Sequence, residues 1–208
     1  MSETTQLQAW KGAFGDAYVE RNAFADWKLK PGVRAFGRIL GARRPASILE
    51  VGSNVGLNLV FLDALLKGAA KLYAVEPNTK AFERLAAQTR VALEQAWNCD
   101  AFRLPLPDAS VDLAFTAGVL IHIAPRDLGR ATDELVRVAK RYVLCIEYFS
   151  REPVEVPYRG TSGLLFKRDF GAWYQERYPS LRCVDYGFLW QREFKIFDDL
   201  HWWLFEKR

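Results

Sequence analysis

The most constraining feature of this chain is a short stretch in which an apolar run, a glycine loop and a second apolar run follow one another. The run Ile48-Leu49-Glu50-Val51 predicts a buried strand, and Leu57-Asn58-Leu59 opens an apolar helical pattern. Gly52 and Gly56 frame the loop between them. Because glycine has no Cβ, such a loop lets the backbone approach a ligand, and the free amides of the following helix face it. We therefore expect a strand, a tight turn and a helix around a bound ligand.

The spacing of this loop separates two classes of cofactor. A dinucleotide fingerprint requires glycines at positions 52, 54 and 57, and only Gly52 meets it. The form acid-x-Gly-x-Gly-x-Gly, used for S-adenosylmethionine, matches Glu50, Gly52 and Gly56 and differs only at Asn54. Asparagine tolerates left-handed dihedral angles better than most residues. The loop favours S-adenosylmethionine, and a turn that serves packing alone is the alternative.

Strand and helix patterns alternate after the loop. Strands are expected at 71–76, around 97–100, at 111–116 and at 142–147, with helices near 56–67, 78–94 and 126–139. This alternation predicts an α/β fold with a mostly parallel sheet and helices on both faces. Ligands of such sheets lie beyond the carboxyl ends of the strands. Polar residues occupy or approach those ends at Glu50, Glu76, Asp100, Thr116 and Glu147.

The two outer segments have a different texture. Aromatic residues and Arg21 recur at helical spacing in the first thirty residues, which predicts either a helix packed on the core or a lid over the site. Residues 151–166 contain prolines and glycines with little periodicity and predict a long excursion over the site. A helix over 167–178 and two aromatic-rich strands, at 181–190 and 200–205, complete the chain. The two strands predict a hairpin whose last strand runs antiparallel to its neighbours.

Composition excludes several classes of protein. The chain has 208 residues, no apolar run of membrane-spanning length and a polar start, so we expect one cytoplasmic domain without a membrane partner. Three isolated cysteines and two histidines predict neither disulfides nor a metal site. The net charge of +4 comes from scattered basic residues. It favours a mildly basic surface over a nucleic-acid interface and suits a small anionic substrate.

The segment after Asp100 carries the most specific motif. An acid followed by Leu104-Pro105-Leu106-Pro107-Asp108-Ala109-Ser110-Val111-Asp112 strongly resembles the region between the third and fourth strands of class I S-adenosylmethionine-dependent methyltransferases. The resemblance covers about residues 46–148. It implies a single-domain, Rossmann-like fold with a seven-stranded sheet and an antiparallel last strand. Together with the outer segments, it leads us to expect a single domain made of an N-terminal helical lid (1–30), a cofactor-binding core (31–150) and a substrate-side excursion with the C-terminal hairpin (151–208).

The resemblance also implies the cofactor site, with S-adenosylhomocysteine as the product. The glycine loop would hold the methionine end, Glu76 the ribose diol and Asp100 the adenine amino group. The cofactor residues expected on this basis are Glu50, Gly52, Ser53, Asn54, Gly56, Asn58, Glu76, Pro77, Asp100, Ala101, Thr116, Ala117 and Gly118.

A narrower resemblance rests on the outer segments. The stretches Trp10 to Asn22, Val119 to Pro125, Glu147-Tyr148, Pro157 to Gly160 and Phe166 to Phe170 are similar to the methylases associated with pseudaminic acid biosynthesis. This implies a small polar, anionic acceptor such as a sugar acid or an amino-acid-like compound. The acceptor-binding residues expected are Trp10, Phe14, Tyr18, Arg21, Asn22, Tyr158, Arg159, Lys167 and Arg168.

Methyl transfer needs alignment of the acceptor, and a base where the acceptor carries a proton. His122 follows the fourth strand and is the first candidate for that base, with a structural histidine as the alternative. Glu147 and Tyr148 are the next candidates for catalysis or for orienting the acceptor. The leading hypothesis is methylation of oxygen or nitrogen on a small metabolite by a monomer or homodimer. The competing hypothesis is a non-catalytic S-adenosylmethionine-binding sensor or assembly protein, and an NAD-dependent oxidoreductase ranks third.

Overall fold

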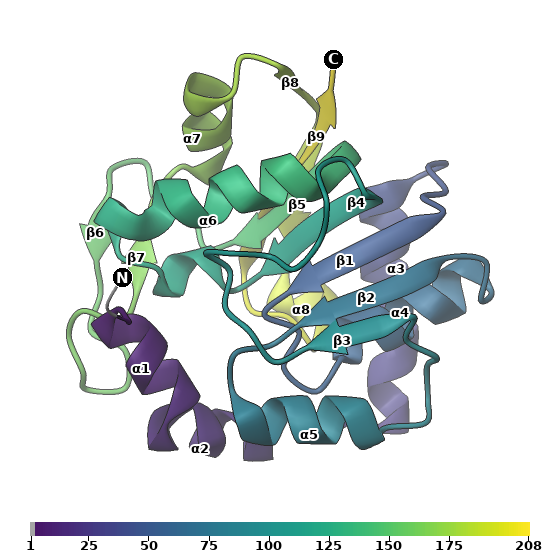
Figure 1. The fold of residues 1–208 in the computed structure, drawn as a ribbon, viewed down its shortest axis with the longest axis horizontal. Coiled ribbons are helices and arrows are strands. Elements are labelled where there is room, and N and C mark those ends of the chain that lie inside the picture. Colours follow the sequence, from purple (N-terminus) through teal and green to yellow (C-terminus); the bar gives the residue numbers. More distant parts are fainter. Residues whose placement is uncertain (1–2) are drawn as a thin grey trace.

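A computed structural model describes residues 3–208 as three layers, with one seven-stranded sheet between helices (Figure 1). The sheet order is β3-β2-β1-β4-β5-β9-β8. Strands β3, β2, β1, β4 and β5 are parallel, whereas β9 runs antiparallel to both of its neighbours, β5 and β8. The predicted Rossmann-like sheet with an antiparallel last strand is therefore confirmed. The strands are β1 (Ser47–Val51), β2 (Lys71–Val75), β3 (Gln95–Trp97), β4 (Val111–Ala117), β5 (Ala139–Glu147), β8 (Leu181–Leu189) and β9 (Leu200–Lys207).

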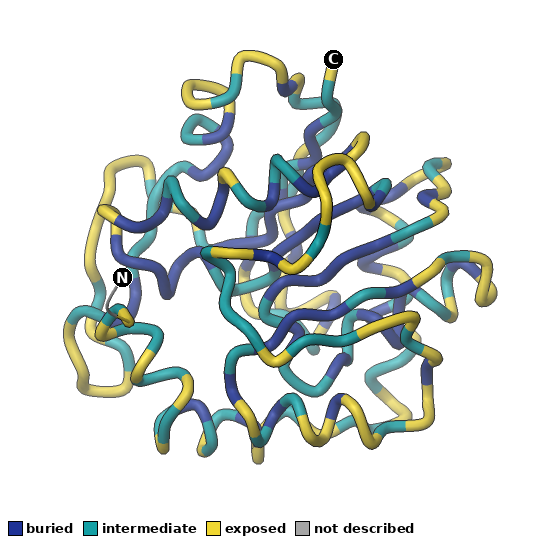
Figure 2. The backbone as a smooth tube through the Cα atoms, in the orientation of Figure 1, coloured by how far each residue is buried: buried dark blue, intermediate teal, exposed yellow. Residues whose placement is uncertain are grey.

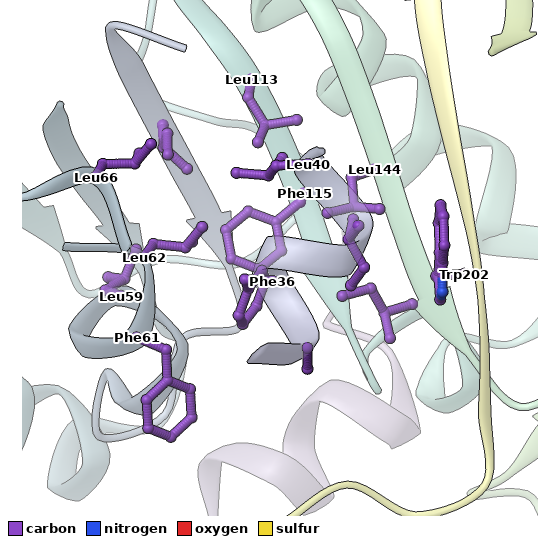
Figure 3. Packing of buried hydrophobic residues seen from close by; sticks show 14 of the residues in the cluster. Phe36, Leu40, Leu59, Phe61, Leu62, Leu66, Leu113, Phe115, Leu144 and Trp202 are labelled. Atoms are coloured by element: carbon purple, nitrogen blue, oxygen red, sulfur yellow. The ribbon is translucent and has the colours of Figure 1, made fainter. Parts of the chain in front are cut away.

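Alternating side chains of the strands build two cores, one on each face of the sheet. Leu113 and Phe115 of β4 and Leu144 of β5 face one core, where they meet helices α3 (Leu29–Leu40) and α4 (Leu57–Leu66) (Figure 3). Ala114 and Cys145 face the other core, covered by α6 (Pro125–Val138) and α7 (Phe170–Arg177). This burial on both faces explains why the strands read as apolar runs. The central strands are accordingly dark blue in Figure 2.

The strand order reverses between β1 and β4, because the chain first builds outward through β2 and β3 and then returns. The carboxyl ends of β1 and β4 thus lie side by side with loops that diverge, which leaves a crevice at this edge. Helix α5 (Thr79–Ala87) follows β2 and packs through Leu85 on the first core. This arrangement positions the site described below.

The N-terminal region forms two helices where the sequence pattern predicted one helical face from Trp10 to Arg21. Helix α1 (Thr5–Lys11) ends at Gly12, and α2 (Ala13–Arg21) begins directly after it. Gly12 has an extended backbone with ψ of −158°, so the helical ladder is interrupted there. A short 3-10 helix, η1 (Asp26–Lys28), joins α2 to α3. No residue of α1 is buried, whereas α2 buries Gly15 and Val19.

Several predicted boundaries were wrong by a few residues. Helix α5 was expected to reach residue 94, but Gln88 turns the chain by accepting bonds from the amides of Arg90 and Val91. Strand β3 consequently lies earlier than predicted, and Asp100 comes three residues after it rather than at its end. Helix α7 begins at Phe170 and not at Lys167, because the side chain of Asp169 caps it.

The predicted excursion over 151–166 is partly ordered into a ladder. The short strands β6 (Val154–Glu155) and β7 (Phe166–Lys167) pair antiparallel. Helix α8 (Gln191–Phe194) and the 3-10 helix η2 (Leu120–His122) complete the elements. Among residues 3–208, no helix is long and apolar enough to cross a membrane. In the same range, the three cysteines are unpaired and no cluster of His, Cys, Asp or Glu suits a metal ion.

Candidate functional site

The glycine loop opens onto a cavity of about 490 Å³ at the carboxyl edge of the sheet. Gly52 and Gly56 have φ of +79° and +81°, and Asn54 between them has φ of +48°. A Cβ on Gly52 would come 2.4 Å from Cγ2 of Val119, so a side chain there would displace the neighbouring loop. The hydroxyl of Ser53 donates to the carbonyl of Glu50 at 2.9 Å and closes the turn. The loop is thus fixed with its backbone on the cavity wall.

Glu76 follows β2 and lies against the glycine loop. Its carboxylate accepts backbone N–H bonds from Asn54 at 2.7 Å and from Asn78 at 2.8 Å. Burial nevertheless raises the pKa of Glu76 to about 7. Each carboxylate oxygen can accept a second bond. Glu76 therefore holds the loop while keeping acceptor capacity on the cavity wall.

The side chain of Glu50 is buried near the end of β1, and only one of its two carboxyl oxygens has a hydrogen-bond partner. Its Oε1 accepts from Nδ2 of Asn58 at 2.7 Å, whereas its Oε2 has no partner. Oδ1 of Asn54 is likewise buried and unpartnered. Both residues line the cavity. Buried acceptors normally find a donor, so these two atoms fit a ligand rich in donors, such as the ammonium group of S-adenosylmethionine.

Ligand binding at these acids is expected to release a proton. Burial raises the pKa of Glu50 to about 8, so in the free protein it is largely protonated at pH 7. A cationic ammonium favours the carboxylate and lowers that pKa, so affinity should increase as pH rises toward 8. Calorimetry of S-adenosylhomocysteine at pH 7, in two buffers of different ionisation enthalpy, should show release of up to about one proton. Equal heats in both buffers would contradict this expectation.

The segment after β3 also contributes to the lining of the cavity. Asp100, Ala101 and Phe102 line it, and Oδ1 of Asp100 accepts the backbone N–H of Phe102 at 2.8 Å. The other carboxylate oxygen of Asp100 makes no hydrogen bond within residues 3–208. The site expected for an adenine ring is therefore flanked by an acid and by apolar side chains.

His122 lies in η2 and lines the cavity next to the loop 117–119. Its Nδ1 lies 2.5 Å from the carbonyl oxygen of Leu164. A carbonyl only accepts, so Nδ1 carries the proton and Nε2 keeps a lone pair. Burial lowers the pKa of His122 to about 4, so the ring is neutral near pH 7. Its ring centroid lies 4.5 Å from that of Trp10 and 5.1 Å from that of Tyr158, with the ring planes tilted by 54° and 51°.

Glu147 does not reach the cavity, contrary to its predicted catalytic position. Its side chain is fully buried and accepts the backbone N–H groups of Val119, Leu120 and Ile121 at 3.0–3.3 Å. It caps the 3-10 helix that carries His122. Tyr148, the next residue, does line the cavity, and its hydroxyl donates to Asp198.

Most of the predicted site residues line this one cavity. The cavity is lined by the cofactor candidates Glu50, Gly52, Ser53, Asn54, Asn58, Glu76, Pro77, Asp100, Ala101, Ala117 and Gly118, and by the acceptor candidates Trp10, Tyr18, Arg21, Asn22, Tyr158 and Arg159. Gly56 and Thr116 are not on the wall. Gly56 underlies the loop, where a Cβ would meet Leu85, and Thr116 is buried inside β4.

Three acceptor candidates lie away from the cavity wall. Phe14 packs behind it, against Trp10 and Tyr158. Lys167 lies over the ring of Tyr148, and Arg168 stacks on Trp173 at 4.2 Å. The role predicted for Lys167 and Arg168, holding an anionic acceptor, does not fit these positions.

Sequence reasoning missed two groups of wall residues. Asn78 holds the N-terminal helices, because its Nδ2 donates to the carbonyl of Trp10 at 3.0 Å and to Asp16 at 2.8 Å. Asp198 and Phe197 come from the link between α8 and β9, far from the cofactor motifs. An acid after an aromatic in a polar link was visible in the sequence, but nothing in it indicated that the link turns toward the site.

The chain is similar to one family of known proteins. Residues 49–146 match the family model described as a methyltransferase domain. No curated protein matches the chain in sequence.

Solved structures share the fold at low sequence identity. The Burkholderia thailandensis 1,6-didemethyltoxoflavin-N1-methyltransferase, bound to 1,6-didemethyltoxoflavin and S-adenosylhomocysteine, is 18% identical with a TM-score of 0.69, over 100% of this chain and 91% of that one. The magnesium protoporphyrin IX methyltransferase from Synechocystis PCC 6803, with bound S-adenosylmethionine, is 11% identical with a TM-score of 0.68, over 100% of each chain.

Proposed function

We propose that this chain, a class I S-adenosylmethionine-dependent methyltransferase, methylates an oxygen or nitrogen of a small polar, anionic acceptor. The enzyme class and the cofactor follow from the methyltransferase-domain match and the fold. The observation that supports the acceptor proposal is the position of His122. Its unprotonated Nε2 belongs to a ring on the wall of the same cavity that the glycine loop enters.

In this proposal the inner half of the cavity holds S-adenosylmethionine. Glu50 and Asn54 accept from its ammonium group, Glu76 from the ribose hydroxyls and Asp100 from the adenine amino group. The cofactor supplies a methyl group activated by its sulfonium. Ser53, Asn58, Pro77, Ala101, Ala117 and Gly118 complete the wall around it. Gly56 and Thr116 support the cofactor site indirectly, by shaping the loop and the end of β4.

The outer half of the cavity receives the acceptor. Trp10, Tyr18 and Tyr158 offer flat apolar walls, while Arg21 and Arg159 offer planar forks that match a carboxylate. A body with an apolar face and an anionic group suits this lining, as a sugar acid or an amino-acid-like compound would provide. The resemblance to the methylases associated with pseudaminic acid biosynthesis supports the same hypothesis, a small anionic acceptor.

The base is proposed to be His122, with Glu147 as a positioning residue and Tyr148 as an acceptor contact. Neutral imidazole can take a proton only if the nucleophile becomes acidic, and a hydroxyl oxygen does so as its bond to the methyl group forms. Glu147 acts through the 3-10 helix that it caps. A non-catalytic S-adenosylmethionine sensor would need no such base and no lined acceptor pocket.

The N-terminal helices are proposed to be a lid that opens for exchange of ligands. Their contacts with the rest of the protein include polar ones, from Gln6 to the carbonyl of Gly163 at 2.9 Å and from Glu20 to Lys80 at 2.7 Å, as well as the ring of Trp10 against His122. Hydrogen exchange over residues 5–27 should slow when cofactor and acceptor are both bound. Full protection in the free protein would support a permanent core helix instead.

Thermal unfolding tests the cofactor half of this proposal. A ligand that binds only the native state stabilises it by mass action. S-adenosylhomocysteine at about 100 times its Kd should raise the melting temperature by roughly 5–10 °C. NAD at the same concentration is the control and should give no shift. A shift with NAD alone would overturn the assignment of the site.

A further inference from the structure

The outer half of the cavity carries charges of both signs. Arg21 and Lys28 reach it from the N-terminal region, Arg159 from the loop before β7, and Asp198 from the link before β9. Within residues 3–208, none of these four side chains forms an ion pair. In the part of the chain that the structure describes, none of these charges is therefore neutralised by an opposite charge within ion-pair distance. A ligand with two charged ends can satisfy both.

Asp198 is oriented by a neighbour and not by a cation. Its Oδ2 accepts the hydroxyl of Tyr148, and its Oδ1 lies at 3.4 Å from Nε2 of Gln191. Tyr148 follows β5 directly and is anchored by the central sheet. Tyr148 therefore fixes the orientation of the Asp198 carboxylate, whose remaining lone pairs can accept from a donor in the cavity.

Aromatic rings surround this carboxylate. Tyr148, Tyr18 and Tyr158 all line the same cavity as Asp198. Burial raises the pKa of both Tyr148 and Tyr18, and the nearby carboxylate of Asp198 adds to the rise in each. A cation is attracted by tyrosine ring faces as well as by a carboxylate. Arg21, Arg159 and Lys167 already lie over these rings, so the carboxylate of Asp198 is the group that favours an ammonium at this place.

The cationic side of the outer half lies on different segments. The guanidinium of Arg159 lies 5.8 Å from the ring centroid of Tyr158, and that of Arg21 lies 5.4 Å from the ring centroid of Tyr18. Each guanidinium is placed over a tyrosine ring and keeps its N–H donors for a ligand. Arg159 adopts a φ of +53°, which turns this loop residue sharply.

We propose that the acceptor is an amino-acid-like zwitterion whose amino group binds Asp198 beside Tyr148 and whose anionic group binds Arg159 and Arg21. This inference rests on the proposed function and narrows its substrate class, from a simple acid to a compound with both charges. It also gives Asp198 a role, because a purely anionic acceptor would be repelled by an unpaired carboxylate at the mouth of its own site.

Matched probe compounds test the zwitterion. The saturated complex with S-adenosylhomocysteine is titrated with aminoalkanoates from glycine to 6-aminohexanoate, and with the corresponding alkanoates and alkylamines. At least one aminoalkanoate should bind about 10-fold or more tightly than its matched alkanoate. Asp198→Asn should remove this preference, while alkanoates should bind at least as tightly as to the parent because the repelling charge is gone. Arg159→Gln should weaken both acids about 10-fold while sparing the alkylamine.

The control variant is Asp199→Asn, which changes the same charge one residue away. Asp199 is not on the cavity wall and accepts the backbone N–H of Gln191, a bond that asparagine can keep. The zwitterion is wrong if alkanoates bind as tightly as every aminoalkanoate, or if Asp198→Asn and Asp199→Asn behave alike. S-adenosylhomocysteine affinity is measured first in each protein. If the parent protein does not bind S-adenosylhomocysteine, the proposed function is wrong. If the parent binds it normally but shows no preference for the amine, only this inference is wrong.

Discussion

Replacing His122 by asparagine is expected to lower kcat by about 100- to 10,000-fold while leaving the fold and the cofactor affinity nearly unchanged. Asparagine can place its amide N–H where Nδ1 of His122 now donates to the carbonyl of Leu164. It has no counterpart of the basic Nε2. The variant therefore removes the base and keeps the structural bond, which separates the two roles that the sequence left open for this residue.

The measurement compares turnover of the acceptor, affinity for S-adenosylhomocysteine and thermal unfolding in the parent and the variant. Unchanged kcat would make His122 a structural residue. The pH profile gives a second readout, because burial lowers the pKa of His122 to about 4. Loss of activity through protonation of this ring should begin only as pH falls toward 4, and kcat/KM should not drop near the ordinary histidine pKa of about 6.5.

The sheet and the gathering of Glu50, Gly52, Asn54 and Glu76 on one cavity could be predicted because their signals are local. Glu50, Gly52 and Asn54 are close in sequence, and an apolar run before them fixes where the strand ends. Glu76 follows the next apolar run, so the parallel order of β1 and β2 brings it to the same edge. Periodicity and strand ends therefore placed these residues without knowledge of tertiary contacts.

The outer half of the cavity could not be predicted in the same way. Asp198 reaches the wall only because β9 inserts between β5 and β8, which directs the preceding link toward Tyr148. Glu147 is an acid at the end of a strand, as expected of a catalytic residue. The loop after β4 folds back, however, and the backbone amides of that loop donate to the Glu147 carboxylate. Lys167 and Arg168 were grouped with Arg159 by sequence, but their stacking on aromatic rings depends on packing that short motifs do not encode.

Replacing Glu147 by alanine is expected to destabilise the protein by roughly 2–5 kcal/mol, which corresponds to a melting temperature lower by roughly 4–20 °C. The change leaves the amides of Val119, Leu120 and Ile121 without their acceptor at the end of β4. Buried donors that lose their partner carry most of this cost. Chemical denaturation of Glu147→Ala measures it, with Glu152→Ala as the control. Glu152 is exposed on the same segment and should change stability by no more than about 0.5 kcal/mol.

The amide variant Glu147→Gln distinguishes positioning from catalysis. Glutamine keeps one oxygen that can accept from the 3-10 helix, so the loss of stability should be smaller than in Glu147→Ala. If Glu147 is a positioning residue, activity and stability should fall together in both variants, because each substitution disturbs the 3-10 helix that carries His122. Full stability of Glu147→Gln combined with a 100-fold loss of kcat would instead return Glu147 to the chemistry, against its place beneath the cavity wall.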